Sequence, residues 1–166
     1  MTINFPIILA TGLIPMFIGF IWYHDKVFGK PWQRASGVTD EMIQSGNMAL
    51  ILGLSYVFSC MLAMMLMTFS IHQFQVQSLF ASDPDFGNPD SESTKYIADF
   101  FARYGDKHRT WSHGAVHGVI ISIFVALPII AIKALFERKN FKYILINFGY
   151  WLLTITAMCA ILCAFV

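Results

Sequence analysis

The chain has 166 residues, of which 57% are hydrophobic and 13% are charged. Soluble domains carry roughly 25% charged residues, so this composition excludes an ordinary soluble domain and is typical of an integral membrane protein. The formal net charge is +1, and neither a glycine-rich phosphate loop nor a basic array is present. These observations exclude nucleic acid as an expected partner and leave the lipid bilayer as the expected environment.

Four stretches are long and apolar enough to cross a hydrocarbon core, which requires about 20 helical residues. In the first stretch the basic residues Lys26, Lys30 and Arg34 follow the apolar run instead of preceding it. We therefore interpret this stretch as a retained span and not as a signal peptide. The sequence predicts a single all-α membrane domain over residues 1–166, built as a four-helix bundle. The expected spans are about residues 3–23, 48–71, 113–135 and 143–165.

The connection between the second and third spans, about residues 73–110, is the longest segment outside the expected spans. It contains a turn-rich segment at 83–90, after which apolar side chains recur at helical spacing. We predict a short amphipathic helix here, which could lie in the membrane interface or cover the bundle. Its apolar positions are Ile97, Phe100, Phe101 and Tyr104, its candidate caps are Ser91 and Ser93, and Gly105 is its expected stop.

Oxygen-bearing side chains in this connection raise the question of a calcium site. The side chains that could supply oxygen ligands are Asp83, Asp85, Asn88, Asp90 and Glu92. However, Thr94 occupies the closing position, where an EF-hand loop needs glutamate. We interpret the segment as a solvated turn.

Lysine and arginine residues near the span ends predict the orientation of the chain. Cytoplasmic loops carry an excess of these residues, and the excess here lies in the first and third connections. Both termini and the middle connection are therefore predicted to be extracytoplasmic, in an inner or plasma membrane. The basic residues of the first and third connections are Lys26, Lys30, Arg34, Lys133, Arg138, Lys139 and Lys142, against Lys95, Arg103, Lys107 and Arg109 in the middle connection.

Two parts of the chain carry a recognisable pattern. Residues 19–41 and 113–153 contain a Trp-Tyr pair, Phe-Gly-Lys-x-Trp, Leu-Phe-Glu and Ile-Asn-x-Gly-Tyr-Trp in that order. This pattern resembles the domain-of-unknown-function family 1761, whose members are small multi-span membrane proteins. The resemblance implies location and architecture, and it assigns no catalytic residue because no biochemical activity defines the family. The matching positions are Trp22, Tyr23, Phe28, Gly29, Lys30, Trp32, Leu135, Phe136, Glu137, Asn147, Gly149, Tyr150 and Trp151.

His113 and His117 are four residues apart at the start of the third span, so they share one face of a helix. This spacing allows both imidazoles to approach one metal ion, but a transition metal needs a third or fourth ligand. His72, at the outer end of the second span, and His108 are the candidates on the same side, whereas His24 lies at the opposite end. A haem with two histidine ligands would pair His72 with one of the two and leave the other free.

A structural role for these histidines is the alternative. Small side chains recur every four residues beside them and form a strip that lets two membrane helices approach closely. The histidines would then donate and accept hydrogen bonds at a helix junction. The strip consists of Gly114, Gly118, Ser122 and Ala126.

Three other polar residues, Tyr56, Asn147 and Tyr150, lie inside expected spans, where their polar atoms need partners. They are candidates for a helix junction or for the lining of a small-molecule cavity. At the opposite end of the bundle from the histidine pair, Lys26, Lys30 and Arg34 are candidates for binding a lipid headgroup.

Asp25 and Glu137 lie at span ends, and no carboxylate lies inside a span, which argues against a proton- or sodium-driven transporter. The leading hypothesis is a non-enzymatic accessory component without a cofactor, which forms a homo-oligomer or joins a larger membrane complex. A pore or carrier for a small solute is the first alternative. A metal or haem redox module based on His72, His113 and His117 is the second.

Overall fold

The computed structural model describes residues 3–166, and this part of the chain is helical with no strands, as predicted. Four apolar stretches are long enough to cross a membrane: Phe5–Trp22, Met48–Ser70, Trp111–Phe136 and Phe141–Phe165. The elements are α1 (Phe5–Thr11), α2 (Ile14–Trp22), η1 (Asp25–Gly29), α3 (Lys30–Ser36), α4 (Asp40–Gln44), α5 (Met48–Ser70), α6 (Gln73–Phe80), α7 (Glu92–Tyr104), α8 (Trp111–Ile121), η2 (Ser122–Ala126), α9 (Leu127–Phe136) and α10 (Phe141–Phe165).

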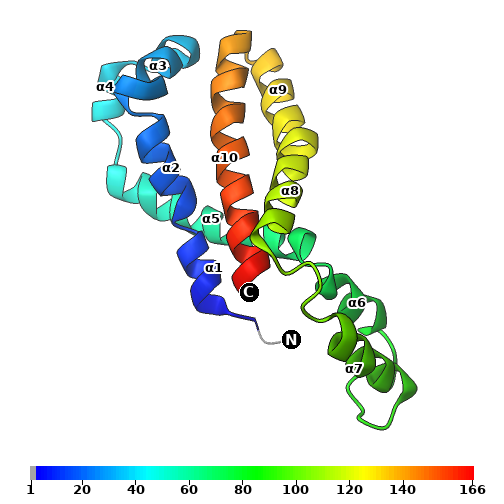
Figure 1. Cartoon of the computed structure of the whole chain (residues 1–166). Helices are drawn as coiled ribbons and strands as arrows, with labels where there is room; N and C mark the ends of the chain where they lie inside the picture. Colours follow the sequence, from blue (N-terminus) through cyan, green and yellow to red (C-terminus); the bar gives the residue numbers. More distant parts are fainter. Residues whose placement is uncertain (1–2) are drawn as a thin grey trace.

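Proline interrupts two of the four spans. Pro15 lies near the start of α2, and the first span is divided there into α1 and α2. In the third span, Pro128 lacks the N–H that an α-helix would use one turn back, and the preceding residues adopt the wider π-helix η2. Both spans are therefore irregular. In each of them the second helix still continues from the first toward the other end of the bundle (Figure 1).

Polar side chains define where three of the four spans begin. Asn47, Thr110 and Asn140 each accept a hydrogen bond from a backbone N–H in the first turn of α5, α8 and α10. Such caps satisfy N–H groups that have no partner within the helix. The helix starts are thus fixed by single residues next to long apolar runs.

Helix α10 is the centre of the bundle, and α8 packs closely along it (Figure 1). Gly114 and Gly118 make this approach possible because their missing side chains leave room for the backbone of α10. A methyl group on Gly118 would lie 2.5 Å from Thr156 Cα, and one on Gly114 would lie 2.7 Å from Cys163 Cβ. The predicted strip of small residues is therefore occupied by α10 of the same chain.

Helix α5 runs obliquely across α10, whereas α2, α8 and α9 run roughly along it (Figure 1). Its buried face contributes Ala63, Leu66 and Met67 to the core, where they pack with Ile155, Met158, Cys159 and Leu162 of α10. Because α5 diverges from α2, the two helices leave a groove between them, which is described below.

The arm, as we call α6 and α7 together, projects from one end of the bundle (Figure 1). Helix α7 has the predicted limits, with Ser91 as its cap and Gly105 as its stop. It packs against α6 in this arm instead of covering the bundle. Helix α6 was absent from the sequence prediction because Gln73-Phe-Gln-Val-Gln77 alternates polar and apolar residues, a pattern typical of strands.

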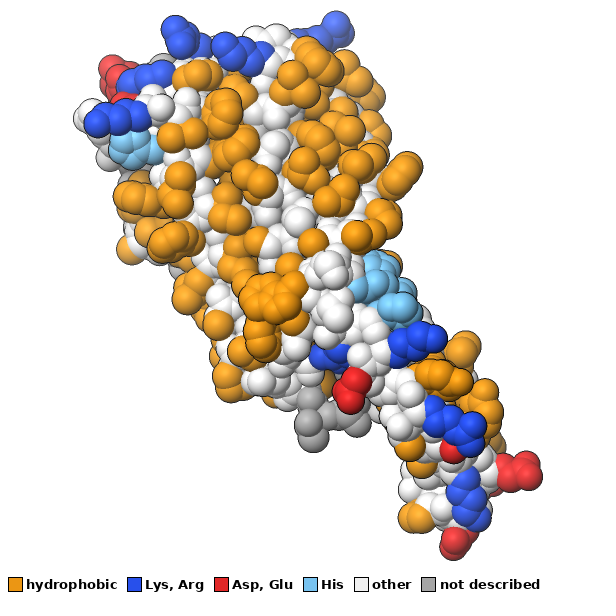
Figure 2. All heavy atoms as spheres, in the orientation of Figure 1, with side chains coloured by type: hydrophobic (Ala, Val, Ile, Leu, Met, Phe, Trp, Pro, Cys, Tyr) orange, Lys and Arg blue, Asp and Glu red, His pale blue; other side chains and the backbone are white. Residues whose placement is uncertain are grey.

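The surface agrees with a membrane setting. Figure 2 shows a wide band of hydrophobic side chains between lysine and arginine residues at one end and the charged arm at the other. The two described ends of the chain and the arm lie at the same end of the bundle, and Asn4 Nδ2 donates to Phe165 O at 3.5 Å. Which of the two ends faces the cytoplasm remains a prediction.

Candidate metal centre

Three histidine side chains converge where the arm joins the bundle. His113 Nε2 lies 3.1 Å from His72 Nε2 and 3.1 Å from His117 Nε2. Within residues 3–166 these histidines are the one group of three metal-ligating side chains whose ligand atoms all lie within 4.8 Å of one another. His113 and His117 lie on adjacent turns of α8, and His72 lies at the start of α6. The fold therefore brings together two helices that are distant in the sequence. We call this group the histidine cluster.

A buried glutamine holds His72 in place. Helix α5 ends at Ser70 because Ile71 is extended, and α6 begins directly after His72. The next residue, Gln73, is only 4% exposed, and its Nε2 lies within hydrogen-bonding distance of three carbonyl oxygens, of Tyr104, Gly105 and Lys107. This contact ties the start of α6 to the loop before α8 and thereby brings His72 to His113.

The start of α8 is fixed by its own set of contacts. The Thr110 hydroxyl accepts a hydrogen bond from His113 N at 3.3 Å. Arg109 Nε donates to Cys163 O at 2.7 Å, and Cys163 Sγ donates to His108 O at 3.3 Å, so the loop is attached to the end of α10. His108 adopts a left-handed backbone with φ 64°, which is uncommon for a residue other than glycine. The loop therefore turns sharply directly before the cluster.

Hydrogen bonding alone accounts poorly for the cluster. A neutral imidazole nitrogen either donates one hydrogen or accepts through one lone pair. His113 Nε2 has two nitrogen neighbours at 3.1 Å, so it would have to share that hydrogen or lone pair between them. A metal ion instead accepts the lone pairs of all three rings. A tetrahedral zinc ion at about 2.0–2.1 Å from each nitrogen would hold the nitrogens about 3.3 Å apart. This is close to the 3.1 Å that separates His113 Nε2 from each of the other two nitrogens.

Haem fits this arrangement less well than a bare ion. Two axial histidines approach a haem iron from opposite faces of the macrocycle. His113 and His117 instead come from the same side, with ring centroids 4.6 Å apart, and His72 is 4.9 Å from His117. The three rings leave no space for a macrocycle between them.

His108 is a fourth imidazole beside the cluster. Its ring stacks on that of His113, with centroids 4.8 Å apart and an angle of 23° between the planes. His72 and His108 also line a hollow of about 380 Å³ on the arm side, together with Tyr104 and Lys107. Because His72 is exposed and the two histidines of α8 are half-buried, the cluster can be reached from this side.

The candidate cavity residues lie at separate helix junctions. Tyr56 OH donates to Leu9 O at 3.2 Å and joins α5 to α1, whereas Tyr150 OH donates to Pro15 O at 2.8 Å and joins α10 to α2. Asn147 Oδ1 accepts a hydrogen bond from Tyr23 OH at 3.1 Å. Tyr150 also borders the groove between α2 and α5.

The three candidate lipid-binding residues line two neighbouring hollows, and Lys30 is common to both. Lys30 Nζ lies 3.4 Å from an Asp25 oxygen and 3.9 Å from an Asp40 oxygen. Lys30 lines a groove together with Lys26, and it also lines a neighbouring hollow together with Arg34. The sequence prediction named neither aspartate as a partner of these lysines.

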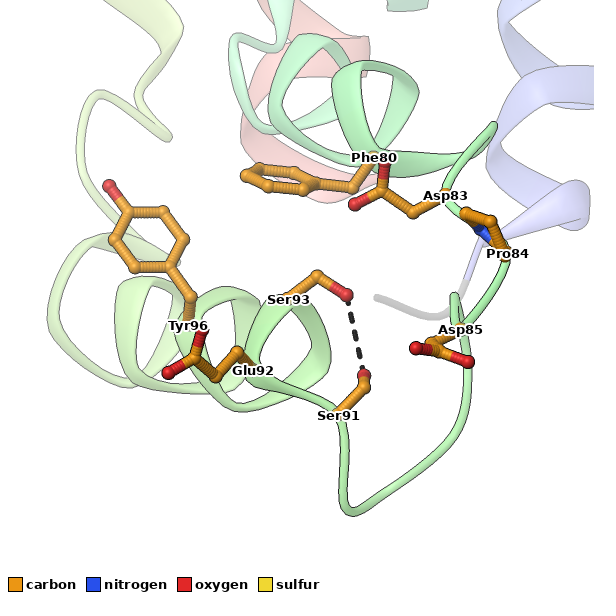
Figure 3. A pocket seen from close by; sticks show the side chains of 8 residues that line it. All are labelled: Phe80, Asp83, Pro84, Asp85, Ser91, Glu92, Ser93 and Tyr96. Carbon is orange, nitrogen blue, oxygen red and sulfur yellow. Dashed lines mark hydrogen bonds between the residues drawn. The ribbon is translucent and has the colours of Figure 1, made fainter.

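The acidic turn of the arm forms an open hollow of about 720 Å³ between α6 and α7 (Figure 3). The carboxylates of Asp83, Asp85 and Glu92 are spread around its rim in Figure 3, and Ser91 and Ser93 share a hydrogen bond of 3.3 Å. Among the described residues these carboxylates do not converge as the histidines do. This arrangement agrees with a solvated turn.

Comparison with known proteins adds the family. The chain matches the family of proteins of unknown function DUF1761 over residues 6–163. It belongs to this family. The DUF1761 match covers the histidine cluster as well as the two stretches that carry the sequence resemblance. No curated protein and no solved structure matches the chain.

Sequence reasoning missed the residues that position the cluster. Gln73 and Arg109 act through backbone oxygens, and no sequence pattern marks which carbonyl groups a side chain will meet. The one hint in the sequence was the position of Gln73 next to His72 at the end of a span, where an amide needs hydrogen-bond partners.

Proposed function

We propose that this DUF1761 protein binds a transition-metal ion through the Nε2 atoms of His72, His113 and His117. The observation that supports the proposal most strongly is the pair of 3.1 Å nitrogen separations at His113. The site lies at the end of the bundle near the arm, where the hydrophobic band ends (Figure 2). An ion there would be reached from the aqueous phase and held by helices of the membrane domain.

The ligand set narrows the choice of metal. Imidazole nitrogen suits zinc, copper, iron and nickel, whereas magnesium and calcium prefer oxygen ligands. Three histidines leave one coordination position of a tetrahedral ion open for water or another ligand, as in catalytic zinc sites. Zinc is therefore the first ion to test, and the open position makes exchange or delivery of the ion feasible.

Equilibrium binding on the full-length protein tests the proposal. We expect detergent-purified protein, stripped with a chelator, to bind one Zn²⁺ per chain in competition with a chromophoric chelator. His113→Ala should weaken binding at least about 100-fold, or roughly 2.7 kcal/mol, because it removes the central ligand. His24→Ala is the matched control, since His24 lies between α2 and η1 at the opposite end of the bundle (Figure 1) and its loss should leave binding unchanged.

Two outcomes would contradict the proposal. The first is no zinc binding above that of the His113→Ala variant, and the second is equal loss with His24→Ala. Thermal unfolding of each variant without metal shows whether a lost site reflects a lost fold.

The other hypotheses remain predictions. The small-residue strip that motivates an oligomeric accessory role is occupied inside the chain by α10. An oligomer would therefore need to form through a different surface.

A further inference from the structure

A groove opens between α2 and α5 at the depth of the hydrophobic band and has a volume of about 790 Å³. Its walls are formed by apolar side chains of α2 and α5, and its floor is formed by α10. Among them are Pro15, Phe20, Leu52, Phe58 and Trp151. The hydroxyls of Ser55 and Ser59 are the small polar groups on the α5 wall.

This apolar groove continues into a second one, of about 940 Å³, which is lined by polar and charged groups. Gly19, Phe20 and Met48 border both, so the two form one path from the interior of the hydrophobic band to its end. We call the whole path the amphiphilic groove. The polar part is bordered by Tyr23, Lys26, Lys30 and Asp40, among others.

The charges of the polar part are balanced. Two lysines, Lys26 and Lys30, face two aspartates, Asp25 and Asp40. Lys30 contacts both aspartates, and Lys26 makes no ion pair among the described residues. A group that carries one negative and one positive charge complements this set better than a purely anionic group, because the aspartates would repel a second negative charge.

The position of the polar part matches the headgroup layer. It lies at the end of the bundle that carries the lysines and arginines in Figure 2. Trp32 borders it, and tryptophan is enriched at the level of lipid headgroups. The apolar part extends from there toward the middle of the hydrophobic band, which is the direction of an acyl chain.

We propose that the amphiphilic groove binds one zwitterionic phospholipid. Its phosphate lies at Lys26 and Lys30, its ammonium group lies toward the aspartates, and one acyl chain lies between α2 and α5. Arg34 takes no part, since it lies outside the groove. The site is at the opposite end of the bundle from the histidine cluster and does not depend on metal binding.

Lipid retention tests the proposal directly. Delipidated protein in detergent is titrated with phosphatidylethanolamine, and bound lipid is counted by native mass spectrometry. We expect one tightly bound lipid per chain, and at least about tenfold weaker binding of phosphatidylglycerol, which lacks the ammonium group. Ser55→Trp should block the apolar part and reduce phosphatidylethanolamine binding at least about tenfold.

Gly53→Trp is the matched control, because it adds the same side chain to the same helix where nothing lies within 4 Å. It should leave lipid binding unchanged. Equal binding by the wild type, the Ser55→Trp variant and the Gly53→Trp variant would overturn the proposal. So would a lipid-free dimer whose crosslinks map to the groove, since a second copy of the chain would then be the occupant.

Discussion

Gln73 shows at the scale of single residues how a metal site can depend on a side chain that is not a ligand. Its amide joins the start of α6 to three carbonyl groups of the loop before α8. The ligand His72 directly precedes it, and His108 and Arg109 continue the loop on the other side. The geometry of the cluster is therefore determined by residues close to the ligands in the sequence. These residues are not ligands, and they hold the backbone in place through hydrogen bonds to carbonyl groups.

We predict that Gln73→Leu weakens zinc binding about 10- to 100-fold, a loss that is usual when a residue supporting a metal ligand is removed. The leucine cannot donate to the three carbonyls, so His72 loses its fixed position. Competition with a chromophoric chelator measures the change. Gln75→Leu is the control because Gln75 is exposed and donates to Thr68 O of α5, away from the loop before α8. If both variants bind zinc as the wild type does, Gln73 has no positioning role.

At the scale of elements, several features were predictable from local sequence. The spans follow from long apolar runs, and the limits of α7 follow from Ser91 and Gly105. The meeting of His72 with the histidines of α8 could only be suggested, because it depends on the break at Ile71 and on contacts between residues more than 30 positions apart. The strip of small residues was recognised, but whether it faced α10 or a second chain required the fold.

The α8–α10 contact leads to a prediction about stability. Gly118→Ala places a methyl group 2.5 Å from Thr156 Cα, so the helices must move apart. We expect a loss of about 1–3 kcal/mol in the free energy of unfolding, as is usual for overpacking. Thermal unfolding in detergent measures the change through the midpoint.

Gly53→Ala provides the comparison for this substitution. Gly53 is also within a helix but has open space around it, so alanine there should leave the protein as stable or slightly more stable. An equal effect of the two substitutions would show that close packing at Gly118 is not the cause.

At the scale of the whole molecule, a hydrophobic band separates two polar ends with different chemistry (Figure 2). One end carries the histidine cluster and the arm, and the other carries the balanced lysine and aspartate groups. Charge counting predicts that the histidine end is extracytoplasmic. Metal binding and the proposed lipid binding would then occur on opposite sides of the membrane.

Cysteine labelling tests this orientation. We expect Ser82→Cys, in the arm, to react with a membrane-impermeant thiol reagent in intact cells or spheroplasts. Lys142→Cys, at the start of α10, should react only after permeabilisation. Of the native cysteines, Cys159 and Cys163 are buried, and Cys60 is half-buried within the span Met48–Ser70, so the background labelling is low. The reverse labelling pattern would invert the predicted orientation without changing the fold.

X-ray absorption at the zinc edge is the most direct test of the metal site. The account predicts that protein loaded with one Zn²⁺ per chain has three imidazole nitrogens at about 2.0–2.1 Å and one further light ligand. His113→Ala should abolish this spectrum, while His24→Ala should retain it. A zinc ion with fewer than two imidazole ligands, or with sulfur ligands, would contradict the assignment of His72, His113 and His117 as a metal site.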